Sequence, residues 1–335
     1  TGIHVIGIAG DLENNGTFSA STGTHTFSGT AKEIRGANFV AIPNVSITGT
    51  YTNKLTGSYN LLNGGPFFIA NGGFRVTTAW IAGAGTLTQF NNALLVNTPA
   101  NITPTLVASA SGNTVVYNAG VVTTIKIPSG GNYYNLILNP TGSTTFSLSG
   151  ATTINNNLTF YPSIINAFFA DATFLLTGPG AGSGTFSMNS PFVNTMNLTN
   201  TTLTPTSPFP SFNTYNIGLN NTVNYNANVA QDIINSAVTS IAFGNLNIGG
   251  TGIKTARQSI TVQGTLTTSG GGLADNGNII TVNGNLAGTA AHTSTGAGKV
   301  LLTGGTQPHT LSRTGAVGNL ELDDVSKAFA LAPMD

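Results

Sequence analysis

The chain has 335 residues, of which only 6% are charged, against roughly 25% in a typical soluble domain. Ten Lys and Arg residues balance ten Asp and Glu residues, which excludes nucleic-acid binding through a basic field and a polybasic membrane anchor. The apolar fraction of 40% argues against disorder. No run of about 18 apolar residues is present, so no helix is expected to span a membrane.

The amino-acid types favour short strands rather than helices. Gly is abundant, with 43 residues, and Thr, Asn and Ser fill most of the polar positions. This mixture is typical of strands that are separated by tight turns. The chain contains no Cys, so disulfides, thiolate metal sites and a cysteine nucleophile are all excluded.

The first predicted strand carries the pattern I-x-I-x-G-x-L over residues 6–12. Two further strands are predicted at residues 25–27 and 44–47, where polar and apolar residues alternate. No charged segment followed by an apolar segment opens the chain, so the sequence shows no signal peptide. We therefore expect that a leader has been removed or that the sequence is an excerpt of a longer chain or a polymer subunit.

A second motif recurs at long range. Residues 113–121 match residues 221–229, and each copy precedes a strand that contains Asn-Leu, at residues 134–138 and 244–248. The predicted larger unit is a T-V strand, then an N-L strand, then an I-x-V-x-G-x-L strand.

Residues 161–220 are the least regular part of the chain. The apolar run Ile164–Phe169 is followed by a stretch with Pro205, Pro208 and Pro210. We predict coils of unequal length with a loop insertion at 161–220. Loops that are displayed on a rigid scaffold often carry function.

The clearest repeat lies near the C-terminus, where I-T-V-Q-G-T-L at 260–266 recurs as I-T-V-N-G-N-L at 280–286. The alternation of apolar and polar residues predicts strands of about five to seven residues with one buried face. The predicted structural repeat residues are Ile260, Val262, Gly264 and Leu266 in the first copy and Ile280, Val282, Gly284 and Leu286 in the second.

The spacing of the two copies predicts the fold class. They lie 20 residues apart without a gap, which is too short for a βαβ unit of roughly 30 residues and suits one coil of a parallel β-helix. We predict an all-β fold without significant helix, a single β-solenoid over residues 1–335. An antiparallel sandwich array would explain the 108-residue spacing of the long-range motif but not the 20-residue repeat.

The low charge content is consistent with stacked coils. Successive coils would lie ~4.8 Å apart, so like charges in one column would repel each other at every layer. Short uncharged Thr, Ser and Asn side chains avoid that cost on the outer faces.

These motifs resemble the repeat units of very large secreted surface proteins of Bacteroidota-type bacteria. The resemblance rests on N-T-V-x-Y-N-A, N-L-x-I and I-T-V-x-G-x-L-T-x-x-G-G, and it is best over residues 221–322. Such proteins are similar in architecture to filamentous adhesins and often leave the cell by the type IX route. The resemblance implies an extracellular location and a structural or adhesive role, and it implies no catalytic residues. Residues 161–220 depart from the pattern.

Acidic residues cluster only at Glu321, Asp323 and Asp324. Glycoside hydrolysis needs two carboxylates that face one groove, and the N-T-D, G-H-G and R-I-K patterns of pectin hydrolases are absent. We predict no catalytic and no cofactor-binding residues. Asp323 and Asp324 are weak candidates for ligands of a single Ca²⁺ ion.

The four histidines, His4, His25, His292 and His309, show no spacing typical of metal ligands. We predict that all four are surface residues rather than a site.

The leading interpretation is an extracellular structural or adhesive rod without catalytic activity, either a filament subunit or part of a giant cell-surface protein. The expected partners are copies of itself or further repeats, joined end to end through open strand edges, and surface glycans. The alternative is a carbohydrate-binding or carbohydrate-cleaving β-helix of the polysaccharide lyase or tailspike type.

An ice-binding face would need Thr-x-Thr pairs at a fixed period. The pairs at 86–88 and 265–267 show no such period.

Overall fold

The structure is a computed structural model. It describes residues 4–20, 23–38, 40–42, 44–55, 59–61, 66–69, 73–76, 81–83, 85–97, 102–161, 167–180, 182–189, 191–201, 207–234, 241–306, 308–324 and 329–331. These residues form strands, turns and one short 3₁₀ turn, η2 (Ser129–Gly131). Within this part of the chain, no helix is long and apolar enough to cross a membrane.

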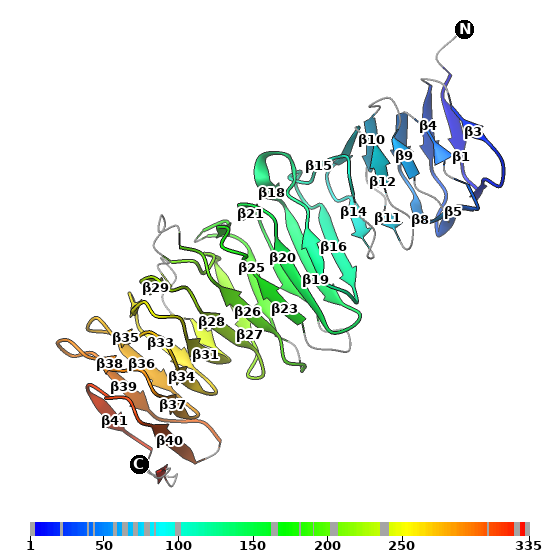
Figure 1. Cartoon of the computed structure of the whole chain (residues 1–335). Helices are drawn as coiled ribbons and strands as arrows, with labels where there is room; N and C mark the ends of the chain where they lie inside the picture. The colour runs from blue at the N-terminus through cyan, green and yellow to red at the C-terminus, as the bar shows by residue number, and fades with distance from the viewer. Residues whose placement is uncertain are drawn as a thin grey trace. The chain divides into compact units, whose positions relative to one another are not determined.

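The chain winds in parallel coils, and each strand pairs with a strand about 21 residues further along (Figure 1). It divides into two compact units, unit 1 with residues 1–144 and 152–158, and unit 2 with residues 145–151 and 159–335. Within the described part of each unit, the strand pairs are parallel. The predicted parallel β-solenoid is therefore confirmed, and the alternative of an antiparallel sandwich array is wrong.

Unit 1 is built from three long sheets and one short one. Sheet A contains β1 (Ile6–Ile8), β4 (Thr24–Phe27), β7 (Asn44–Ile47), β10 (Pro66–Ile69), β13 (Thr86–Gln89) and β15 (Thr105–Val107). Sheet B contains β2 (Leu12–Glu13), β5 (Lys32–Gly36), β8 (Thr50–Leu55), β11 (Gly73–Val76), β14 (Leu94–Asn97), β16 (Thr114–Ala119) and β19 (Asn135–Pro140). Sheet C contains β3 (Phe18–Ser19), β6 (Val40–Ala41), β9 (Tyr59–Leu61) and β12 (Ile81–Gly83). Sheet D joins β18 (Asn132–Tyr133) to β21 (Thr152–Ile154), and β17 (Thr123–Ile125) precedes β18.

Unit 2 also has three long sheets. Sheet E contains β23 (Ala167–Ala170), β26 (Thr195–Leu198), β28 (Thr222–Tyr225), β31 (Asn245–Ile248), β34 (Leu266–Thr268), β37 (Leu286–Gly288), β40 (His309–Arg313) and β42 (Phe329–Leu331). Sheet F contains β29 (Gln231–Ile233), β32 (Lys254–Ala256), β35 (Leu273–Ala274) and β38 (His292–Thr293). Sheet G contains β30 (Ala242–Phe243), β33 (Ile260–Val262), β36 (Ile279–Val282), β39 (Lys299–Leu302) and β41 (Leu320–Leu322). A further sheet of unit 2 contains β22 (Leu158–Phe160), β25 (Thr185–Met188) and β27 (Thr214–Ile217) in that order. The other two strands are β24 (Leu176–Thr177) and β20 (Thr144–Leu148).

Inward-facing side chains stack in columns that run from coil to coil. In sheet A, Phe27 pairs with Ile47 and Ile47 pairs with Ile69, and all three side chains are fully buried. Burying one such side chain stabilises the fold by roughly 1.5–3 kcal/mol. Successive residues of a strand point to opposite faces. Thr26 and Ser46, which precede Phe27 and Ile47 in their strands, therefore face outward.

The repeat near the C-terminus places equivalent residues directly above one another. Ile260 pairs with Ile280, and Val262 pairs with Val282. Leu266 pairs with Leu286 in the neighbouring sheet. The six apolar repeat residues are at most 2% exposed.

The seven-residue repeat does not form one strand, however, and this corrects the predicted strand length. The chain turns a corner at Gln263–Thr265, between β33 of sheet G and β34 of sheet E. The reason is the glycine in the middle of the pattern. A Cβ atom on Gly284 would lie 2.3 Å from the carbonyl oxygen of Gly264, so only glycine allows the corners of consecutive coils to approach this closely.

The T-V and N-L strands also differ from the expectation. They are paired neighbours in one sheet, since β16 pairs with β19 in unit 1 and β28 pairs with β31 in unit 2. The two motifs therefore belong to consecutive coils and are not successive strands of one coil.

Part of the irregular segment forms an aromatic core in unit 2. Phe209 lies between Pro208 and Pro210, Phe212 follows them, and both rings are almost fully buried. Their rings lie 5.3 and 5.9 Å from the ring of Phe186, and the Tyr215 hydroxyl donates a hydrogen bond to the Pro210 carbonyl oxygen at 3.0 Å. Most of residues 167–201 are described and contain the strands β23 to β26, whereas residues 162–166 and 202–206, with Ile164 and Pro205, lie outside the described residues.

Candidate functional site

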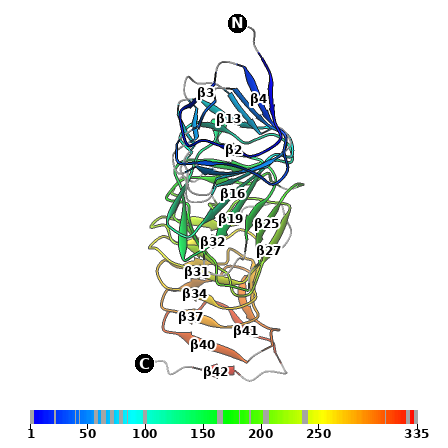
Figure 2. The same cartoon turned by 90° about the vertical axis from the view of Figure 1, so that its right-hand side faces the viewer.

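The outer side of sheet E carries two columns of small uncharged side chains, all of them polar except Ala287. The first column contains Thr195, Thr222, Asn245, Thr265, Asn285 and Thr310, and the second contains Asn197, Asn224, Asn247, Thr267, Ala287 and Ser312. We call these twelve residues the polar face. Figure 2 shows four of its strands, β31, β34, β37 and β40, stacked one above the other.

Asparagine side chains connect the coils of the polar face. The Asn224 amide donates a hydrogen bond to the Asn197 amide oxygen at 2.6 Å. The amide oxygen of Asn245 accepts a hydrogen bond from the Thr265 backbone N–H at 2.8 Å. These bonds hold the amide planes in fixed orientations, so the face presents ordered donors and acceptors to the solvent.

The polar face is slightly hollowed at its centre and ends on an aromatic ring. A shallow depression of about 310 Å³ lies among its central residues, Thr222, Asn224, Asn245, Asn247, Thr265 and Thr267. On β23, Phe168 pairs with Thr195 at the head of the first column, and its side chain is 39% exposed. Exposed aromatic rings and fixed polar groups are both typical of binding surfaces.

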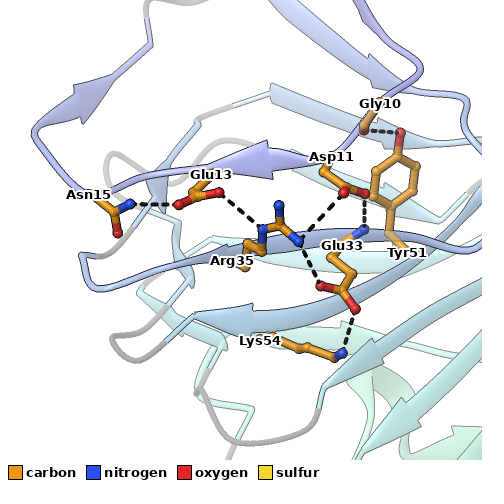
Figure 3. A network of polar contacts seen from close by, with 8 residues as sticks. All are labelled: Gly10, Asp11, Glu13, Asn15, Glu33, Arg35, Tyr51 and Lys54. Atoms are coloured by element: carbon orange, nitrogen blue, oxygen red, sulfur yellow. Dashed lines mark hydrogen bonds and ion pairs between the residues drawn. The ribbon is translucent and has the colours of Figure 1, made fainter.

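Unit 1 carries a different kind of surface, a network of charged side chains on β2, β5 and β8 (Figure 3). The Arg35 guanidinium lies 3.2 Å from the Glu13 carboxylate, 3.4 Å from Glu33 and 3.7 Å from Asp11. The Lys54 ammonium donates a hydrogen bond to the other oxygen of the Glu33 carboxylate. Each cation therefore faces at least one carboxylate from another coil.

The pKa shifts in this network follow from these contacts. The hydrogen bond from Lys54 lowers the pKa of the Glu33 carboxyl below its usual value. The hydrogen bond to Glu13 raises the pKa of the Arg35 guanidinium. All these side chains are open to solvent. Their ion pairs therefore contribute little to the free energy of unfolding.

Unit 2 uses ion pairs in the same way on its surface. Arg257 lies 2.8 Å from Asp232, and Lys299 lies 2.5 Å from Glu321. In both pairs the two residues come from neighbouring coils. Stacked charges are therefore tolerated where their signs alternate, which agrees with the physical reason given for the low charge content.

Unit 2 also places an ammonium group inside the solenoid. Lys254 on β32 is fully buried, and its Nζ atom donates hydrogen bonds to the carbonyl oxygens of Ala227, Val229 and Gly252 at 2.8, 3.0 and 2.8 Å. These carbonyl groups belong to turns that follow sheet E in two consecutive coils. Burial lowers the pKa of the Lys254 amine to about 8.

Other coils of unit 2 place a donor at the same corner. The Gln231 amide, which pairs in register with Lys254, donates a hydrogen bond to the Asn200 carbonyl oxygen at 3.1 Å. The Arg313 guanidinium donates to the Ala290 carbonyl oxygen. Inward-facing polar side chains thus satisfy turn carbonyl groups that would otherwise be buried without a partner.

A buried carboxylate–imidazole contact lies near this corner. The Nε2 atom of His292 is 3.2 Å from the Oδ2 atom of Asp275, and both side chains are at most 1% exposed. Burial lowers the pKa of His292; Asp275 opposes this effect and Arg313 adds to it. Burial raises the pKa of Asp275, but hydrogen bonds from the Ser294 hydroxyl and from backbone N–H groups outweigh it, so the net shift is downward.

The predicted metal candidates lie in different surroundings. The Asp324 carboxylate turns inward, 3.3 Å from the Nε2 atom of buried His309, whereas Asp323 is exposed. In the part of the chain that the structure describes, no three His, Cys, Asp or Glu side chains form a group that could hold a metal ion.

The prediction of surface histidines is wrong for three of the four residues. His25, His292 and His309 are at most 4% exposed, and only His4 is an exposed residue. The reason is that inward-facing imidazoles meet turn carbonyl groups. The Nδ1 atom of His309 lies 2.6 Å from the Gly284 carbonyl oxygen, and that of His25 lies 3.0 Å from the Gly23 carbonyl oxygen.

The polar face was missed at the level of the sequence, although a signal for it exists. Residues 195–197, 222–224, 245–247 and 265–267 all have a small polar residue on each side of an apolar one. The coil lengths in this part of the chain are unequal, so these triplets do not stand at a constant period. No protein-family model, no curated protein and no solved structure matches the chain.

Proposed function

We propose that this chain is part of an extracellular structural or adhesive protein and that it acts without catalysis. The stacked coils provide the structural element, and the polar face provides the contact surface. The observation that carries this proposal is the regular outer side of sheet E, where six consecutive coils present Thr, Asn or Ser in at least one of the two columns. The resemblance of the repeat motifs to surface proteins of Bacteroidota-type bacteria supports the location.

End-to-end association is part of the proposal. Ile6 lies in the same column as buried His25, and Leu322 lies in the same column as buried Leu302. Both side chains nevertheless remain about half exposed, at 47% and 48%. Unpaired strand edges with apolar side chains favour pairing with a further coil, either of the same polypeptide or of a second copy.

Sedimentation velocity over a range of concentrations tests this association. We expect oligomers that grow with concentration, and we expect Leu322→Asp to reduce them because it places a charge in the proposed contact. Ile253→Asp is the matched control, since Ile253 is similarly exposed, at 55%, and lies in a turn between coils. A chain that stays monomeric at all concentrations, or a control variant that acts like Leu322→Asp, would contradict the association.

Adhesion is tested with the chain immobilised on beads that are held against coated surfaces under flow. We expect retention on at least one neutral polysaccharide film and a strong loss for Thr267→Asp, which places a charge at the centre of the polar face. Thr261→Asp is the control, because Thr261 faces outward on sheet G and pairs with uncharged residues. Beads that are not retained on any film, or that are retained equally with both variants, would argue against the adhesive role.

A further inference from the structure

A groove runs along the corner between sheets G and E, at one edge of the polar face. Its volume is about 330 Å³, within the range of roughly 300–1,000 Å³ that is typical of small-molecule sites. The residues that line it are Leu219, Gln263, Gly264, Thr265, Asn283, Gly284, Asn285, Gly305, Thr306 and Pro308. Thr265 also borders the depression on the polar face, so the two hollows adjoin.

The repeat glycines give the groove its depth. Gly264 and Gly284 form consecutive corners whose backbones approach each other closely, and a Cβ atom on either residue would lie within 2.4 Å of a neighbouring atom. Side chains therefore project only from the flanking positions, which are Gln263 and Asn283 on one side and Thr265 and Asn285 on the other.

The walls of the groove combine amide groups with apolar surface. Three amide side chains, Gln263, Asn283 and Asn285, face it, and Leu219 and Pro308 form exposed apolar parts of its rim. The Leu219 side chain is 55% exposed. A sugar ring has the matching surfaces, because its hydroxyl groups donate and accept hydrogen bonds while its C–H groups pack on apolar side chains.

One amide in the groove has unused hydrogen-bonding capacity. The Oδ1 atom of Asn283 is buried and accepts no hydrogen bond. Buried polar atoms are nearly always partnered, so this oxygen would gain a partner if rotation of the amide brought it to the groove. The two ends of an amide exchange places by a half-turn about χ2, which allows Asn283 to offer either its acceptor or its donor to a ligand in the groove.

The absence of charged residues in the groove favours uncharged ligands. None of the residues that line it is charged, so a carboxylate, sulfate or phosphate group would lose its hydration without gaining a cation. A neutral ligand that is rich in hydroxyl groups meets no such penalty.

We propose that this corner groove binds a neutral saccharide, with the Asn283 amide as its anchor. The inference rests on the proposed adhesive role and deepens it, because it names the ligand class and one subsite beside the polar face. A longer glycan bound in the groove would continue over Thr265 onto the polar face.

Isothermal titration calorimetry of the full chain with short α-linked and β-linked glucose oligomers tests the proposal. We expect binding of at least one neutral oligomer and none of oligoglucuronate, the anionic counterpart in which a carboxylate replaces the C6 hydroxymethyl group. Asn283→Ala should weaken binding about tenfold, as expected for the loss of one or two hydrogen bonds to the ligand. Thr306→Trp, which fills the groove from an exposed position, should abolish binding.

Two control variants separate the groove from its surroundings. Asn139→Ala removes an amide whose oxygen is likewise buried without a partner, but it lies on β19 of unit 1 and should leave affinity unchanged. Asn247→Ala lies on the polar face outside the groove and should weaken only longer oligomers. Equal affinity in the wild type and Asn283→Ala, with both chains folded by circular dichroism, would overturn the proposal.

The outcomes also separate this proposal from the adhesive role. Retention of beads on polysaccharide films together with unchanged affinity in Asn283→Ala and Thr306→Trp would leave the adhesive role standing and refute the groove. Failure to bind any neutral oligomer, combined with inhibition of ice recrystallisation that is lost in Thr267→Asp, would assign the polar face to ordered water and refute the saccharide site.

Discussion

Both units pair charges between neighbouring coils on their surfaces, but unit 2 also buries Lys and Arg side chains. Unit 1 keeps Arg35 and Lys54 on the outer side of sheet B, where carboxylates of neighbouring coils face them. Unit 2 places Lys254, His292 and Arg313 inside the solenoid, against carbonyl groups or a carboxylate. Outside, charge is tolerated because its sign alternates and water screens it. Inside, it is tolerated where Lys254 and Arg313 donate hydrogen bonds to turn carbonyl groups that would otherwise be unpaired.

This difference predicts that equivalent charge deletions have unequal effects. Lys254→Met should cause the largest loss, because it leaves three buried carbonyl groups without their donor. We expect the free energy of unfolding to fall by about 3 kcal/mol or more, measured by chemical denaturation. Lys54→Met is the matched control from unit 1 and should change it little, because Lys54 is half exposed. Similar losses in both variants would show that the comparison is wrong.

The backbones of the two units also differ at the repeat glycines, which are closely stacked in unit 2 at Gly284 and open in unit 1 at Gly10. Gly284→Ala should cost about 1–3 kcal/mol, as expected for overpacking, because its Cβ atom would meet the Gly264 carbonyl oxygen. Gly10→Ala is the matched control, since Gly10 has the same place in the I-x-I-x-G-x-L pattern, but a Cβ atom there would meet no other atom within 4 Å. Thermal unfolding of both variants measures the difference. A tolerated Gly284→Ala would indicate that the corners of unit 2 are not closely stacked.

The buried imidazole predicts a pH dependence that is specific to unit 2. Burial lowers the pKa of His292 in the folded chain, so the unfolded chain takes up a proton at a higher pH than the folded chain does. The free energy of unfolding should therefore fall as the pH drops from about 6.5 through the lower pKa of the folded state. Two charged groups also act on this imidazole: Asp275 raises the pKa of His292 and Arg313 lowers it.

Denaturation curves of wild type and His292→Gln at a series of pH values isolate this contribution. The variant should lose the part of the acid dependence that lies just below pH 6.5. Parallel curves for the two chains across that range would show that His292 does not titrate differently in the folded and unfolded states.

The charged network of unit 1 predicts the smallest effect, and one that depends on salt. Arg35→Glu would place an additional carboxylate beside Asp11, Glu13 and Glu33, so the melting temperature should fall at low ionic strength and recover when salt is added. Wild type should show little salt dependence, because its charges are paired. A loss that persists in high salt would mean that Arg35 contributes through packing rather than through charge.

Several of these features follow from local sequence. The apolar alternation and the 20-residue spacing of Ile260 and Ile280 were enough to predict parallel coils, because a side chain's direction in a strand depends only on its position within that strand. The same reasoning placed Val262 and Leu266 in the interior. It could not show that a corner separates them, because that corner depends on how closely Gly264 and Gly284 approach each other.

Local patterns in the chain are therefore sufficient to predict the fold class, the coil period and the inward-facing apolar residues of the repeat. They do not predict that Lys254 and three histidines lie in or beside the core, or that Thr and Asn residues of six coils line up in one polar face. The physical reason is distance along the chain. Lys254 meets the carbonyl group of Ala227, and Asn224 meets Asn197, each across 27 residues, and no local pattern encodes contacts between neighbouring coils of unequal length.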